Sequence, residues 1–187
     1  MEPIVLASSS PRRRELLEQY NIPYIVDFEE IEEVLDESLT LFYQLQMLAI
    51  DKGKVVASRH LQEVVISCDT MVCLHHKMLG KANNRQHARE MLQAMSNQKQ
   101  TVYSAVAIFY KGQIHTFVES SDVYFKELSS REIEDYLDTN EWVGKAGAYA
   151  IQGIGNCLVE KVEGSFETII GFPVFRILEV LVKIKTI

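Results

Sequence analysis

A long β-rich stretch, TVYSAVAIFYKGQIHTFVESSDVYF (residues 101–125), occupies the middle of the sequence and indicates its fold class. The Lys111-Gly112 pair interrupts this stretch, which predicts a hairpin of two strands. Strand-like runs and helical segments alternate irregularly on either side of the hairpin. That order favours a mixed α/β fold, with helices on both faces of the sheet, over an all-parallel array.

Capping residues and the spacing of apolar side chains delimit the other elements. The length of 187 residues suits a single domain, residues 1–187, which could form two lobes. We expect strands over residues 4–7, 24–28 and 158–162, and β-rich runs over 63–67 and 71–74. Helices are expected to begin near Pro11, Thr40, Asn84, either Ser129 or Ser130, and Pro173.

The net charge of −7 argues against a broad nucleic-acid-binding surface, so a phosphate site would be a local basic pocket for a small nucleotide. The three cysteines have no CxxC spacing, which argues against a disulfide framework and a structural zinc site. No signal peptide is indicated, and no apolar run approaches the roughly 18 residues that span a bilayer. We therefore expect a cytoplasmic protein without membrane or nucleic-acid-polymer partners.

Three consecutive arginines follow Pro11 in the segment LASSSPRRRELL. Ser10 suits the N-cap of a helix and Pro11 its first position. A helix N-terminus normally prefers acidic residues, because its unpaired backbone N–H groups carry partial positive charge. Arg12 and Arg13 flank the apolar stripe of the helix, so we predict that they face an anion, for which phosphate has a suitable geometry. The alternative is an ordinary exposed, arginine-rich turn.

Two further charged residues stand among apolar neighbours. Asp69 separates the runs VVI and MVCL, where a buried carboxylate is costly unless a metal, a cation or hydrogen bonds hold it. The alternative is that Asp69 and Thr70 form a turn between two strands. Lys52 lies on the apolar face of its expected helix, where it either meets a ligand or extends its ammonium group to solvent.

Two other segments have both a functional and a structural interpretation. The acidic run of residues 29–33 could join Asp69 in holding Mg²⁺ or Mn²⁺, or it could be solvated surface. The glycine-rich segment GKAGAYAIQGIG could admit a ligand, with Gln152 at a base edge, or simply form a tight connection. Two common phosphate-binding loops are excluded, because His75 and Leu158 occupy the glycine positions that they require.

Six separated segments together resemble a known family. In chain order they are LASSSPRRRELL, IEEVL, CDTMV, LGKA, KAGAYAIQG and VEGSFETIIGFP, at roughly that family's spacing. The family is the Maf family of nucleoside triphosphate pyrophosphatases, and the resemblance covers nearly the whole chain. It implies a Maf/ITPase-like fold, in which helices flank a mixed, elongated β-sheet and two lobes surround a cleft.

The resemblance also implies an activity and a site. The family hydrolyses the α-β phosphoanhydride of a nucleoside triphosphate with a divalent cation, and the AYAIQG segment is similar to the branch that acts on dTTP and UTP. A homodimer is implied as well. Asp69 is implied as the proton acceptor for the attacking water or as a metal ligand, with Glu33 beside the metal. The substrate-binding positions implied by the resemblance are Ser8, Ser10, Arg12, Arg13, Lys52, Thr70, Lys81 and Gln152.

Three positions depart from the family's pattern. Gly144 stands where an aspartate is usual, Ala82 where the family has the proline of Gly-Lys-Pro, and Phe172 where it has the leucine of Gly-Leu-Pro. Of these three departures, only Gly144 replaces a charged residue, and the contacts of the neighbouring Lys145 depend on that charge. The alternative function is a nucleotide-binding regulator of cell division or septum formation with incidental turnover. A further alternative is the same hydrolysis with a purine triphosphate as the substrate.

Overall fold

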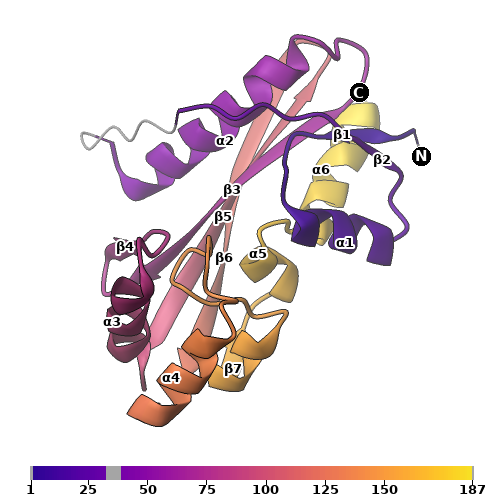
Figure 1. Ribbon diagram of the computed structural model, residues 1–187. Coiled ribbons are helices and arrows are strands. Elements are labelled where there is room, and N and C mark those ends of the chain that lie inside the picture. The colour runs from indigo at the N-terminus through magenta and orange to yellow at the C-terminus, as the bar shows by residue number, and fades with distance from the viewer. Residues whose placement is uncertain (1, 33–38, 187) are drawn as a thin grey trace. The chain divides into compact units, whose positions relative to one another are not determined.

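The computed structural model describes residues 2–32 and 39–186, which form a mixed α/β fold (Figure 1). The strands are β1 (Ile4–Leu6), β2 (Tyr24–Val26), β3 (Val65–Leu74), β4 (Lys77–Leu79), β5 (Lys99–Tyr110), β6 (Gln113–Phe125) and β7 (Val159–Glu163). The helices are α1 (Pro11–Gln19), α2 (Leu41–Ala57), α3 (Arg85–Met95), α4 (Ser130–Asp138), the 3-10 helix η1 (Ile154–Leu158), α5 (Phe166–Ile170) and α6 (Val174–Thr186).

The strands form one seven-stranded sheet in the order β2-β1-β3-β5-β6-β7, with β4 paired to β3 off this path. Strand β1 is parallel to both β2 and β3, whereas β4 is antiparallel to β3 and β7 is antiparallel to β6. The expected mixed sheet is therefore confirmed. The expected hairpin turn is confirmed too, because Lys111 and Gly112 both take positive φ values, 48° and 76°, as the favoured two-residue hairpin turns require.

The chain divides into two compact units. The first consists of Met1–Asp69, Ser104–Glu119 and Ile170–Ile187, and the second of Thr70–Tyr103 and Ser120–Ile169. Strands β3, β5 and β6 each contribute residues to both units. The single domain expected from the length and the family resemblance stays a prediction.

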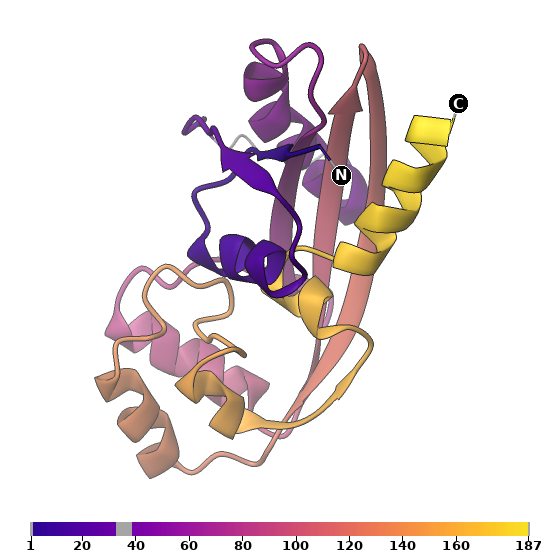
Figure 2. The ribbon, with the colours of Figure 1, turned by 90° about the vertical axis from the view of Figure 1, so that its right-hand side faces the viewer.

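In the first unit, α2 and α6 lie on opposite sides of the strands (Figures 1 and 2). Helix α2 turns an apolar stripe inward, of which Leu45, Ala49 and Val56 are fully buried. Their spacings of four and seven residues are those of one face of a helix. Helix α1 lies beside α6, where the rings of Tyr20 and Phe175 meet edge to face with centroids 5.5 Å apart.

In the second unit, α3 and α4 lie side by side and are joined by ion pairs. Arg85 and Arg89 of α3 both contact the Glu134 carboxylate of α4, which lowers the pKa of Glu134 to about 2. Both helices begin where capping residues predicted. The Asn84 side chain accepts a hydrogen bond from the His87 N–H at 2.8 Å, and a capping box opens α4. Within residues 2–32 and 39–186, no helix combines the length and apolar character needed to cross a bilayer.

Candidate functional site

The arginine-rich helix start forms as the sequence predicts. Ser10 is the N-cap of α1 and Pro11 its first residue. The Arg13 side chain is held at two points: its Nε donates to the Gly171 carbonyl at 3.0 Å, and its Nη1 donates to Ser8 Oγ at 2.8 Å. Ser8 Oγ also accepts the Ser10 backbone N–H at 3.2 Å. The SSSPRR segment and Gly171 of the GFP segment therefore meet in the first unit, at a half-buried guanidinium group.

Asp69 lies inside one continuous strand, so the alternative of a turn at Asp69-Thr70 is wrong. Strand β3 runs from Val65 to Leu74 without interruption, and Asp69 is only 9% exposed. The Lys52 ammonium group of α2 contacts Asp69 Oδ1 directly. Lys52 does not extend to solvent; it supplies the cation that the buried carboxylate needs.

Helix α2 can approach the strands at this point because residue 53 is a glycine. A Cβ atom built at Gly53 would lie 2.3 Å from the Phe109 ring and 2.3 Å from Ser67 Oγ, far inside van der Waals contact. The Ser67 hydroxyl donates to the Ala49 carbonyl of the same helix at 2.6 Å. This close packing positions Lys52, the residue before Gly53 in α2, against Asp69.

The buried thiol of Cys68, which precedes Asp69 on β3, is influenced by three charged groups of the first unit. Burial raises the pKa of Cys68 to about 11. The positive charges of Arg13 and Lys52 lower the pKa of this thiol, whereas the negative charge of Asp69 raises it further. Arg13, Lys52 and Asp69 therefore all lie within electrostatic reach of Cys68.

We expect Cys68 to resist alkylation in the folded protein. The thiolate is the reactive form, and burial keeps the Cys68 thiol protonated at neutral pH. Iodoacetamide at neutral pH should modify the exposed Cys157 and spare Cys68 in the native state, and it should modify all three cysteines in denaturant, as read by mass spectrometry. The Cys157→Ser variant is the control and should show no fast labelling. Labelling of native Cys68 at the rate of Cys157 would contradict the burial of this group.

In the second unit, the LGKA and KAGAYAIQG segments lie next to each other. Lys81 and Ala146 form an isolated antiparallel β-bridge, and the Gly147 N–H donates to the Gly80 carbonyl at 3.1 Å. Gly147 takes φ 68°, and a Cβ atom there would lie 3.2 Å from Val72 of β3. Lys81 itself is exposed.

The glycine-rich segment contains a buried tyrosine and an exposed glutamine. Tyr149 is 5% exposed and packs edge to face on Phe125, with ring centroids 4.9 Å apart, whereas Gln152 is exposed in a turn. Ala148 takes φ 59°, an uncommon value for alanine and one that is often found at functional sites. Gly144, where the family has an aspartate, takes φ 71° beside open space, so its backbone conformation favours glycine.

The other implied positions differ in what surrounds them. Arg12 lies half-buried in the first turn of α1, and Thr70 follows Asp69 along β3. Glu33 lies outside the described residues. Glu29, from the same acidic run, pairs at 2.7 Å with Arg59, which also contacts Asp27, so Glu29 belongs to a surface ion cluster.

The described residues offer one buried carboxylate for a divalent cation. Within residues 2–32 and 39–186, no three His, Cys, Asp or Glu side chains gather as a ready metal site. Mg²⁺ is commonly held by one or two carboxylates together with substrate phosphates and water. Asp69 therefore suits such an ion as a single oxygen ligand beside bound phosphates.

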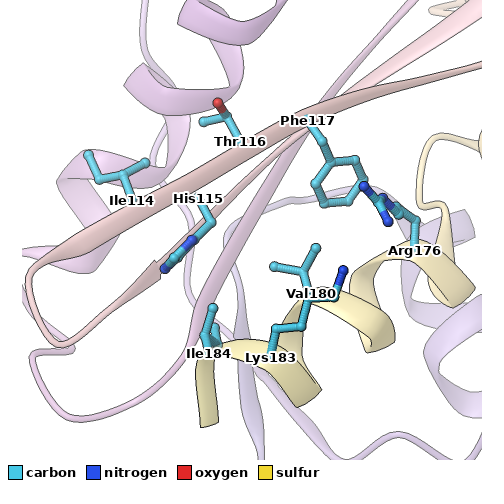
Figure 3. Close-up of a pocket in the computed structure, with 8 residues that line it drawn as sticks. All are labelled: Ile114, His115, Thr116, Phe117, Arg176, Val180, Lys183 and Ile184. Carbon is cyan, nitrogen blue, oxygen red and sulfur yellow. The ribbon is translucent and has the colours of Figure 1, made fainter. Parts of the chain in front are cut away.

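A pocket of about 470 Å³ lies between β6 and α6 of the first unit (Figure 3). Its lining includes the cationic side chains of Arg176 and Lys183 beside Phe117 and Val180. Arg176 pairs with Glu179 at 2.7 Å. None of the predicted site residues that the structure describes lines this pocket.

Two comparisons with known proteins agree with the segment pattern. The sequence profile of a family described as "Maf-like protein" matches residues 3–184. A protein of Halalkalibacterium halodurans is 41% identical over 181 residues, which cover 97% of this chain and 95% of that protein. A protein of Clostridioides difficile is 40% identical over 182 residues, covering 96% and 94%. A Bacillus cereus protein is 38% identical over 97% of this chain and 95% of its own length. All three are named dTTP/UTP pyrophosphatase.

Proposed function

Since the chain belongs to the Maf family, we propose that it is a nucleoside triphosphate pyrophosphatase that acts on dTTP and UTP. The structural observation that supports this proposal is the direct contact of Lys52 with the buried carboxylate of Asp69. A protein that only bound nucleotide would have no need of a carboxylate held in place among phosphate-binding cations. The shared name of the relatives supports the choice of base.

The proposed reaction is the attack of water on the α-phosphorus. The bond between this phosphorus and the oxygen that bridges it to the β-phosphorus breaks, and pyrophosphate leaves. Asp69 accepts the proton that the water loses, while Lys52 holds the carboxylate in its orientation. The products are the nucleoside monophosphate and pyrophosphate.

The remaining assignments concern the substrate and a metal ion. Arg13 and Lys52 offset the negative charge of the phosphates, which is the main requirement of phosphoryl transfer. Asp69 and Glu33 would hold Mg²⁺ or Mn²⁺, which would supply further neutralisation of the phosphate charge. The substrate contacts are assigned to Ser8, Ser10, Arg12, Arg13, Lys52, Thr70, Lys81 and Gln152.

A panel of triphosphates tests reaction and specificity together. The purified protein with Mg²⁺ or Mn²⁺ should release pyrophosphate from dTTP and UTP faster than from CTP, GTP or ITP, as read by product chromatography. Excess EDTA should abolish the release, and added Mn²⁺ should restore it. Tight triphosphate binding without pyrophosphate release would instead support a nucleotide-binding regulator. Fastest release from GTP or ITP would keep the chemistry but overturn the assigned base.

A homodimer and a cytoplasmic location complete the proposal. The dimer follows from the family resemblance, and light scattering after size exclusion would report twice the chain mass of 21.4 kDa. The location agrees with free cysteines, two of them buried.

A further inference from the structure

A carboxylate that follows α4 holds the loop that carries Gln152. Glu141 Oε1 accepts the Ile154 N–H at 2.9 Å, and Glu141 Oε2 accepts the Gly155 N–H at 2.8 Å. These N–H groups begin η1 and have no partner within that helix. Glu141 therefore caps η1 from 13 residues earlier in the chain, with both of its oxygens engaged in charge-assisted hydrogen bonds.

A tyrosine of α4 holds the other end of the same loop. The Tyr136 hydroxyl accepts the Ala150 N–H at 3.3 Å, and it also hydrogen-bonds to Glu141. Tyr136 is only 2% exposed, and burial together with the Glu141 carboxylate raises its pKa above the ordinary value. The hydroxyl thus keeps its proton and can donate it to the carboxylate.

The sequence of the loop fits this arrangement. A Cβ atom at Gly153 would lie 1.7 Å from Glu141 Oε1, so any side chain there would displace the carboxylate. A Cβ atom at Gly155 would lie 2.6 Å from the Ala150 carbonyl oxygen. Of the three residues held by hydrogen bonds, Ala150 stands two positions before Gln152 and Ile154 two positions after it.

We infer that Glu141, together with Tyr136, is a positioning residue that fixes Gln152 and thereby sets the preference for UTP over CTP. The inference rests on the proposed function. Uracil and cytosine differ in the order of hydrogen-bond donor and acceptor on the edge that a glutamine amide would meet, and the amide can supply both groups. A glutamine discriminates between these edges only if its amide does not turn over and its backbone does not shift, and the contacts of Glu141 and Tyr136 meet the second condition.

The kcat/KM values for UTP and CTP test this inference. Glu141→Ala should lower the UTP-over-CTP ratio about tenfold, the cost of roughly one lost hydrogen bond. Glu141→Gln keeps one acceptor oxygen and should lie between the wild type and Glu141→Ala. Gly153→Ala, which displaces the same carboxylate, should reproduce the loss. The matched control is Glu160→Gln, an exposed glutamate of β7 in the same unit, which should leave the ratio unchanged.

A double variant separates positioning from a general structural effect. If Glu141 acts through Gln152, Glu141→Ala in a Gln152→Ala background should change the ratio no further. Hydrogen exchange should show faster exchange of the Ile154 and Gly155 amides in Glu141→Ala while the thermal midpoint stays near that of the control. An unchanged UTP-over-CTP ratio in Glu141→Ala, with UTP hydrolysed, would overturn this inference alone. Absence of triphosphate hydrolysis by the wild type would overturn the proposed function and the inference with it.

Discussion

Asp69→Asn is expected to lower kcat for pyrophosphate release by at least about a hundredfold. Asparagine has nearly the same shape as aspartate, but its amide neither accepts the proton of the attacking water nor binds a divalent cation as a carboxylate does. The contact with Lys52 also loses its charge complementarity. Steady-state release of pyrophosphate from UTP at saturating Mg²⁺ measures the effect.

The control for this variant is Asp51→Asn, which removes an aspartate charge from an exposed position of α2 next to Lys52. It should retain wild-type kcat. Thermal unfolding of both variants should show that Asp69→Asn is folded at the assay temperature. If folded Asp69→Asn kept wild-type turnover, Asp69 would have no part in the reaction.

Gly53→Ala is expected to destabilise the protein by about 1–3 kcal/mol, the usual range for overpacking a close-packed interior. The sign is informative, because replacing glycine by alanine inside an exposed helix normally stabilises it by about 1 kcal/mol. Here the added methyl group would meet the Phe109 ring and Ser67 Oγ at 2.3 Å, so α2 must move away from the strands. Urea denaturation measures the loss, and a fall in kcat should accompany it because Lys52 moves with the helix.

A second substitution tests the assigned cause. Phe109→Leu removes part of the ring that the new methyl group would meet, so Gly53→Ala should cost less in that background than in the wild type. Lys54→Ala, at an exposed position of the same helix, should change stability little. Increased stability of Gly53→Ala would show that the close approach of α2 is not required.

Local features of the fold could be read from the sequence. Ser10, Asn84 and Ser129 are the N-caps of the helices that follow them, and Lys111-Gly112 forms the hairpin turn. Each signal lies within a few residues of its consequence, because a cap or a turn depends on nearby backbone N–H groups and φ values. The alternation of elements likewise predicted the mixed sheet.

The contacts of the candidate site were harder to predict. Asp69 and Lys52 each had two interpretations, because the residue type does not reveal whether a partner 17 positions away is close in space. The Gly171 carbonyl that holds Arg13 carries no side-chain signal at all. The role of Glu141 was not predicted, because a single glutamate after a helix is ordinary and its hydrogen-bond partners lie in another segment.

The six matching segments were enough to recognise the family and the class of reaction, because residue types and their order along the chain carry that information without coordinates. Spatial contacts settled that Asp69 is an interior strand residue held by Lys52 and that Gly53 permits their approach. Side chains distant in sequence become neighbours through packing, and packing depends on the whole chain at once. Local patterns therefore identify the participants, whereas their distances and partners emerge with the folded core.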